Sequence, residues 1–251
     1  MDEAQKIQEG GYFFPYHYLD LRSDEHRLIL HVEYVSRLKT VKDLLRPFHG
    51  QLILDAGCGD GRFCYEMRGE SVRMIGTDYS DKSLAFARLF NPQTEFYRQD
   101  LKNLNLPYQF DAVVLIETLE HIPPADIPIV LESLARVLTP GGKLIITVPS
   151  VNIPLAIVKK HYQHFSKNSL INTVKDHFKV LECFGHSRVR GGYGRKLFSA
   201  LRKMSMVFYP FRRDFHFVYG IFDYLNNYYE KHFAIGKPEE CNGIIAVCVK
   251  H

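Results

Sequence analysis

The chain has 251 residues, of which 46% are hydrophobic, and its 32 Lys and Arg against 28 Asp and Glu give a formal net charge of +4. This length and composition predict one domain over residues 1–251 with a sizeable core, and the charge is too mild for the strongly basic surface of a nucleic-acid-binding protein. No apolar run approaches a membrane span, and the first residues lack the apolar core of a signal peptide. Five cysteines without a Cys-x-x-Cys pair favour reduced thiols, so we expect a cytoplasmic protein.

The N-terminal residues 1–46 combine an aromatic segment with a helix. Residues 10–20 are crowded with aromatic side chains, and a helix is predicted from Asp24 to about Leu45. Its apolar positions repeat at helical spacing, which predicts packing on a sheet: Leu28, Val32, Val35, Leu38, Val41 and Leu45. The aromatic segment either contacts a ligand through Tyr16, His17, Tyr18 or Arg22, or pins this helix to the sheet.

A core of parallel strands is predicted over residues 47–189, and it opens with a glycine-rich turn. Residues 52–61 read Leu-Ile-Leu-Asp-Ala-Gly-Cys-Gly-Asp-Gly, an apolar strand running into a turn where glycines let backbone amides approach a ligand. A dinucleotide-binding turn has the spacing G-x-G-x-x-G, whereas the glycines here alternate. Asp55 disfavours a pyrophosphate and favours a cofactor that carries an amino group.

Two further predicted strands also end in acids. A short helix within Arg62–Gly69 precedes a strand at Val72–Asp78, and a third strand follows at Thr94–Asp100. An acid at the end of the second strand of such a sheet can accept hydrogen bonds from ribose hydroxyls, which is the role expected of Asp78. The alternative is that Asp78 caps the next helix, although Ser80 suits that task.

The fourth and fifth predicted strands flank a helix. The strand Asp111–Ile116 runs into Glu117-Thr-Leu-Glu-His-Ile-Pro-Pro124. Helical spacing of apolar residues continues to Leu138 and stops at Thr139-Pro-Gly-Gly142. A buried strand, Lys143–Pro149, follows, and then His161-Tyr-Gln-His-Phe-Ser166, in which Ser166 is placed to cap a helix.

The last two predicted strands, Lys179–Phe184 and Asn242–Val249, are separated by an insertion at residues 190–240. From Tyr193 to Phe233 it holds 13 of the chain's 33 Phe and Tyr residues. Such an aromatic segment is expected to form a lid, an acceptor pocket or a dimer surface. Two aromatic helices joined at Pro210 are predicted from two apolar stripes: Leu197, Leu201, Met204 and Phe208, then Val218, Ile221, Phe222, Leu225 and Tyr229. A basic edge accompanies them: Arg195, Lys196, Arg202, Lys203, Arg212 and Arg213.

The ordered motifs resemble those of class I S-adenosylmethionine (SAM)-dependent methyltransferases of the small-molecule type, similar to methyltransferase domains 11 and 25. The resemblance implies an α/β fold, a seven-stranded Rossmann-like sheet with an antiparallel last strand (241–251), with SAM as cofactor and S-adenosylhomocysteine (SAH) as product. In that family Asp100 and Leu101 would hold the adenine and Glu117 the methionine portion. The implied cofactor contacts are Asp55, Gly57, Cys58, Gly59, Gly61, Asp78, Tyr79, Asp100, Leu101 and Glu117.

The same resemblance places Tyr18, His161 and His164 at the substrate. Two histidines at i and i+3 also suit a metal, but without a further ligand cluster in the sequence we expect no metal. Methyl transfer from a sulfonium needs mainly in-line SN2 alignment, and a hydroxyl acceptor also needs a base. His121 is the expected base, with Glu120 orienting it or binding the acceptor, and His164 and His161 next. The alternative for His121 is a structural histidine.

The expected function is methylation of a small molecule. The preferred acceptor is a hydroxyl of a sugar, a nucleotide-linked intermediate or a secondary metabolite. Methylation of nitrogen or carbon stays open. An Asn/Asp-Pro-Pro-aromatic motif for base amines is absent after the fourth strand, and so is a Pro-Cys nucleophile, so nucleic acid is a disfavoured partner. The alternatives are an RNA methyltransferase and a SAM-binding protein without catalysis, and a homodimer through the insertion is possible.

Overall fold

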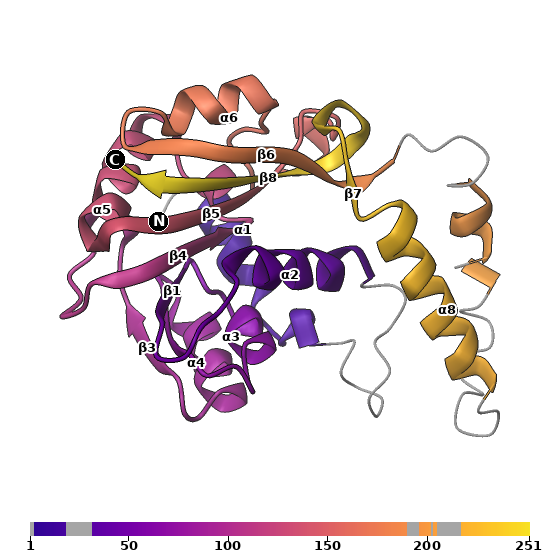
Figure 1. Cartoon of the computed structure of the whole chain (residues 1–251), viewed down its shortest axis with the longest axis horizontal. Coiled ribbons are helices and arrows are strands. Elements are labelled where there is room, and N and C mark those ends of the chain that lie inside the picture. The colour runs from indigo at the N-terminus through magenta and orange to yellow at the C-terminus, as the bar shows by residue number, and fades with distance from the viewer. Residues whose placement is uncertain (1–2, 19–31, 190–195, 202, 205–216) are drawn as a thin grey trace.

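The computed structural model describes residues 3–18, 32–189, 196–201, 203–204 and 217–251. One mixed sheet crosses the molecule (Figure 1), with eight strands in the order β3-β2-β1-β4-β5-β8-β6-β7. The strands are β1 Leu52–Ala56, β2 Arg73–Asp78, β3 Glu95–Arg98, β4 Phe110–Ile116, β5 Leu138–Pro149, β6 Phe178–Arg188, β7 Ile235–Gly236 and β8 Cys241–Lys250.

The predicted α/β class and the antiparallel last strand are confirmed, because β8 pairs antiparallel with both β5 and β6. The predicted count of seven strands is wrong. The eighth strand is β7, two residues that pair with Gly185 and His186 at the edge of the sheet. A two-residue strand has no apolar alternation that a sequence pattern could reveal.

The helices are α1 Glu3–Gly11, α2 Val32–Leu45, α3 Arg62–Glu66, α4 Asp81–Phe90, α5 Ile127–Val137, α6 Lys167–Val174 and α8 Phe217–His232. α5 and α6 pack on one face of the sheet and α2, α3 and α4 on the other, whereas α8 stands beyond the end of the sheet (Figure 1). Leu138, expected at the helix end, is instead the first residue of β5 and pairs with Phe110 beside a bulge. Ser80 caps α4 by accepting a hydrogen bond from Ser83 N. Ser166 caps α6 through a capping box, so both predicted caps are confirmed.

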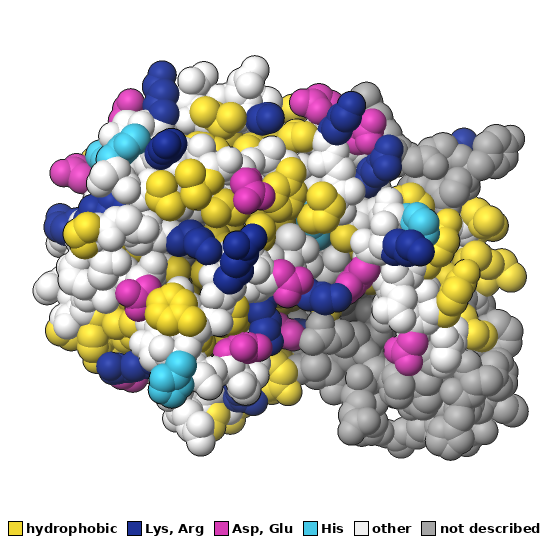
Figure 2. Space-filling view, viewed as in Figure 1, with side chains coloured by type: hydrophobic (Ala, Val, Ile, Leu, Met, Phe, Trp, Pro, Cys, Tyr) yellow, Lys and Arg dark blue, Asp and Glu magenta, His cyan; other side chains and the backbone are white. Residues whose placement is uncertain are grey.

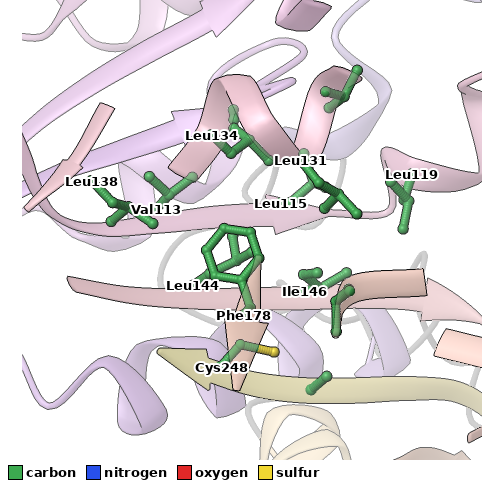
Figure 3. Packing of buried hydrophobic residues seen from close by; sticks show 14 of the residues in the cluster. Val113, Leu115, Leu119, Leu131, Leu134, Leu138, Leu144, Ile146, Phe178 and Cys248 are labelled. Carbon is green, nitrogen blue, oxygen red and sulfur yellow. The ribbon is translucent and has the colours of Figure 1, made fainter. Parts of the chain in front are cut away.

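Alternating residues of the central strands feed two separate cores. Val113 and Leu115 of β4 pack with α5 on one face (Figure 3), and Val114 packs with α2, α3 and α4 on the other. Buried parallel strands with both faces covered explain the continuous apolar runs of the sequence. The result is a three-layer domain whose sheet carries the site at the carboxyl ends of its parallel strands.

The N-terminal helix packs on the sheet as its apolar stripe predicts. In α2 the buried side chains include Val32, Val35, Leu38, Val41 and Leu45. The expected helical residues before Val32, with Leu28 and Arg22, lie outside the described residues.

The insertion stands against one end of α2 (Figure 1) through a third, aromatic core. Phe222, Leu225 and Tyr229 of α8 are buried in it as predicted. The stripe expected on the preceding helix is wrong, because Leu197, Leu201 and Met204 are exposed and Phe198 is the buried residue. Phe208, Pro210, Arg195, Arg202, Arg212 and Arg213 lie outside the described residues, as does the side chain of Val218.

Hydrophobic side chains are visible over α8 in the space-filling view (Figure 2), and Tyr224 is 66% exposed there. The homodimer expected through this insertion stays a prediction. None of the helices within the described residues combines the length and apolar character needed to cross a membrane. All five cysteines are free.

Candidate functional site

One cavity of about 740 Å³ lies at the carboxyl ends of β1, β2, β3 and β4. The strand order reverses between β1 and β4, and ligands of open α/β sheets bind at that point. The cavity brings together nine of the ten predicted cofactor residues with Glu120, His121 and His161 from the predicted acceptor side. Those nine are Asp55, Gly57, Cys58, Gly59, Asp78, Tyr79, Asp100, Leu101 and Glu117.

The glycine turn after β1 has a backbone that only glycine adopts easily. Gly57, Gly59 and Gly61 have φ angles of 74°, 54° and 78°, in the left-handed region that costs other residues energy. A Cβ on Gly57 would collide with Thr118, and one on Gly59 would lie 2.9 Å from the Tyr12 hydroxyl. Gly61 lies outside the cavity lining, packed on Ala87 of α4, so its role is to bring the turn against that helix.

Asp78 ties the turn to the end of β2. Its carboxylate accepts hydrogen bonds from Gly59 N and Ser80 N, both at 2.9 Å. Burial raises its pKa, and these two backbone bonds lower it. The Ser83 side chain is a third hydrogen-bond partner of this carboxylate. A carboxylate has about four acceptor positions, so about one remains for a hydroxyl in the cavity.

Asp55 and Cys58 form the floor of the turn. Burial raises the pKa of Asp55 to about 7, and the Cys64 thiol, which donates to its Oδ2 at 3.6 Å, opposes that shift. Burial also raises the pKa of the Cys58 thiol, so Cys58 stays neutral and packs as a small apolar side chain.

The third strand places its acid at an open edge of the cavity. Asp100 is exposed and accepts a hydrogen bond from Lys102 N at 2.9 Å, which starts a short 3₁₀ turn at Leu101–Asn103. Leu101 packs on the edge of the main core. Tyr79 donates to Gln8 of α1 at 3.3 Å, so α1 borders this part of the cavity.

Glu117 adopts an unusual backbone at the end of β4. Its φ is 48°, uncommon for a residue with a Cβ. Thr147 holds it there, because Glu117 N donates to Thr147 O at 3.0 Å and the Thr147 hydroxyl donates to Glu117 Oε1. Arg37 of α2 pairs with Glu117 Oε2 at 3.2 Å. The cavity therefore presents a carboxylate and a positively charged guanidinium side by side.

Glu120, His121 and His161 meet in the same cavity. One ligand atom of each residue lies within 4.8 Å of the others. The rings of His121 and His161 have centroids 4.6 Å apart and stand edge to face. Burial lowers the pKa of His121 to about 4 and that of His161 to about 3, so both are neutral near pH 7.

His164 and Tyr18 lie outside the cavity lining. Both ring nitrogens of His164 are engaged, with Ile153 O at 2.7 Å and His161 Nδ1 at 2.8 Å, so it positions His161. Tyr18 stacks on Phe90 and donates to Asp60 O. It pins the aromatic segment to the turn and to α4, which neither of the two roles open from the sequence describes.

Several lining residues were missed by sequence reasoning. Tyr12, Glu9 and Gln8 reach the cavity from the end of α1, and Arg37 and Tyr34 reach it from α2. The apolar stripe of α2 identified its buried face, but no pattern marks which flanking polar residue meets a cavity. Tyr16 and His17 do line it, as one of the two sequence readings required.

Part of the chain is similar to known methyltransferases. Residues 53–142 match the methyltransferase domain family. The chain is 33% identical over 131 residues to the ubiquinone biosynthesis O-methyltransferase of Paracidovorax citrulli, covering 48% of this chain and 54% of that protein. It is 36% identical over 124 residues to the protein of the same name from Alkalilimnicola ehrlichii, covering 46% and 49%. The chain spans about half the length of the curated relatives it matches.

Solved structures show the fold over the whole chain. The magnesium protoporphyrin IX methyltransferase of Synechocystis PCC 6803 with bound SAM has a TM-score of 0.61 at 16% identity, covering 100% of this chain and 98% of that one. The N-methyltransferase NodS of Bradyrhizobium japonicum with SAH has a TM-score of 0.57 at 11% identity, covering 99% of each. The fold is that of the class I SAM-dependent methyltransferases. The match to the methyltransferase domain family is confined to residues 53–142.

Proposed function

We propose that this protein transfers the methyl group of SAM to a hydroxyl oxygen of a small molecule. The observation that carries the proposal is the single cavity that joins the glycine turn and the acids at three strand ends to a cluster of Glu and His side chains. The names of the relatives, O-methyltransferases of ubiquinone biosynthesis, support oxygen as the methylated atom.

The two ends of SAM find complementary groups. Asp78 has a free acceptor position for a ribose hydroxyl, and Asp100 with Leu101 borders the space for the adenine. The amino acid end of SAM carries an ammonium and a carboxylate, which the Glu117 and Arg37 pair matches in charge. Asp55 and Tyr12 close the turn beneath and beside it.

The transfer itself needs alignment of the acceptor oxygen behind the sulfonium methyl. Holding the two reactants in line contributes up to about 7–11 kcal/mol. The hydroxyl must also lose its proton, and His121, which lines the cavity, is the base expected from the sequence. With a pKa of about 4, its imidazole would take a proton from a phenol of pKa about 10 at a cost of about 8 kcal/mol. His121 alone therefore does not account for the removal of the proton, and a further group must take part.

The test measures SAM binding and then turnover. Isothermal titration should give binding of SAM and SAH and none of NAD, because the glycine spacing and Asp55 oppose a pyrophosphate. Mass spectrometry of reactions with a panel of phenols, sugars and amines should give SAH together with a product heavier by one methyl, with phenols and sugars ahead of amines. Binding of NAD in place of SAM would refute the proposal.

Two alternatives have separate readouts. An RNA methyltransferase would bind RNA with an affinity that falls steeply as salt rises. A binding protein without catalysis would retain SAM and form no SAH with any acceptor. The formal charge of +4 and the neutral His pair in the cavity favour a small acceptor over RNA.

A further inference from the structure

The cluster of Glu120, His121 and His161 has the chemistry of a metal site. We propose that these three residues bind one divalent transition-metal ion, which holds and acidifies the acceptor hydroxyl. The expectation of no metal rested on finding only two neighbouring histidines in the sequence. The fold supplies the missing partners, because residues 120 and 121 follow β4 and His161 comes from the loop after β5. This inference rests on the proposed methyl transfer and deepens it.

Hydrogen bonds fix which ring nitrogen carries the hydrogen in both histidines of the cluster, directly in His121 and through His164 in His161. Nδ1 of His121 lies 3.0 Å from Lys160 O, and since a carbonyl only accepts, the hydrogen is on Nδ1 and Nε2 carries the lone pair. Ile153 O fixes His164 in the same way. The Nε2 of His164 then accepts from Nδ1 of His161 at 2.8 Å, which frees Nε2 of His161. A second group that holds the far ring nitrogen is typical of metal-binding histidines.

Glu120 is the strongest sign of a missing cation. Its side chain is 1% exposed, and neither carboxylate oxygen has a hydrogen-bond partner. A buried acid without partners is costly, and a cation between it and two imidazole nitrogens would remove that cost.

The donor set selects the kind of ion. Two imidazole nitrogens and one carboxylate suit Zn²⁺, Fe²⁺ or Co²⁺, whereas Mg²⁺ prefers oxygen ligands. Bonds of about 2.1 Å separate neighbouring ligands by about 3.3 Å, so the atoms now within 4.8 Å need only small side-chain rotations. Three protein ligands leave an open position toward the cavity, as in catalytic zinc sites.

The open position would take the acceptor oxygen. A bound divalent ion would lower the pKa of a coordinated hydroxyl by several units. The hydroxyl could then lose its proton without a strong base beside it. The proton passes to water in the open cavity, and the oxygen forms its bond to the methyl carbon as the bond from carbon to sulfur breaks. The overall balance is SAM plus hydroxyl giving SAH, methyl ether and one proton.

The test uses protein without an affinity tag and Zn²⁺ as the probe. Dialysis against buffered Zn²⁺ should leave one ion per chain, and Glu120→Gln and His161→Ala should each weaken binding at least about tenfold. Glu132→Gln and His49→Ala are matched controls, because both side chains are exposed and away from the cavity, and they should bind like the wild type. All variants should keep their SAM affinity, which shows that they are folded.

A second measurement does not depend on variants. X-ray absorption of the wild-type protein loaded with Zn²⁺ should show only nitrogen and oxygen ligands near 2.0–2.1 Å, two of them imidazoles. Sulfur ligands near 2.3 Å would mean that the cysteine thiols bind the ion, and absence of stoichiometric zinc in a protein that binds SAM would equally overturn the metal site. Failure to bind SAM at all would count against the proposed function instead.

Discussion

Asp78 links the glycine turn to the cofactor space through a single carboxylate. Two backbone amides hold it in place at the cavity wall, where we propose that it accepts a hydrogen bond from the ribose. Asp78→Asn exchanges one oxygen for an NH₂ group that must face either an amide hydrogen or a hydroxyl. We expect SAM affinity to fall by roughly 1–3 kcal/mol, the scale of a charged hydrogen bond, as measured by isothermal titration.

Asp43 provides the matched control for this change. It is exposed on α2 and away from the cavity, so Asp43→Asn should bind SAM like the wild type. Equal affinity of Asp78→Asn and wild type would rule out the ribose contact.

Asp55 makes the stability of the ligand-free protein depend on pH. Its pKa is raised by burial to about 7, against about 3.9 in an unfolded chain. The folded state therefore binds the proton more tightly, so this stabilising contribution is complete below about pH 4 and is lost as pH rises to about 7. Integrated over the shift, the loss is up to about 4 kcal/mol.

Replacement of Asp55 by Asn removes this titration. In urea unfolding, the free energy of the wild type relative to Asp55→Asn should fall between about pH 4 and 7 and stay level above that range. A difference that does not change with pH would show that Asp55 titrates normally in the folded protein.

Among single residues, the acids Asp55, Asp78 and Asp100 could be predicted as site residues from the sequence, because each lies at the end of an apolar strand. The sequence did not identify Arg37 or Tyr12, whose helices reach the cavity only after packing. In the sequence His161 lies forty-one positions after Glu120, and the pairing of β4 with β5 helps to bring the two residues together.

Helix α6 depends on its first turn. Ser166 accepts from Ser169 N at 3.1 Å, and Ser169 Oγ accepts from Ser166 N at 2.9 Å, which completes a capping box. Ser166→Ala leaves the Ser169 amide without its partner and should lower the free energy of unfolding by about 0.5–2 kcal/mol. Urea denaturation measures this, with Ser71→Ala as a control at an exposed site.

If Ser166→Ala unfolded like the control, solvent would be satisfying the first turn of α6 equally well. SAM binding should be unchanged in either case, since α6 does not line the cavity.

Elements with strong periodicity were predicted well, and short or irregular ones were not. The strands that end in acids and the stripes of α2 and α5 appear as expected, because burial on a sheet dictates their pattern. The edge strand β7 and the exposed face of the helix before α8 follow from tertiary packing around Phe198 and Tyr229, which a local pattern does not contain.

For the whole molecule, helix α8 of the insertion packs on the rest of the fold through a small aromatic core. Phe222 is 2% exposed within it, next to Tyr229 and Val32. Phe222→Ala should lower the free energy of unfolding by up to about 3–5 kcal/mol, with the upper value expected if this core unfolds together with the sheet. Because no described residue of the insertion lines the cavity, SAM affinity should stay unchanged.

Hydrogen exchange followed by mass spectrometry tests whether this core unfolds together with the sheet. In Phe222→Ala the amides of α8 should exchange faster while those of β1 and β4 keep their protection. Faster exchange spread evenly over the chain would mean that the insertion and the sheet unfold together.

The near-contact of Gly57 with Thr118 links the glycine turn to the residues that follow β4. Gly57 belongs to the turn that we propose for the methyl donor, and Thr118 lies beside the residues that we propose for the acceptor. If binding of SAM shifts the turn, Thr118 must move with it, and by thermodynamic reciprocity an acceptor that binds more tightly after SAM must strengthen SAM binding by the same factor. SAM and acceptor are then expected to bind cooperatively.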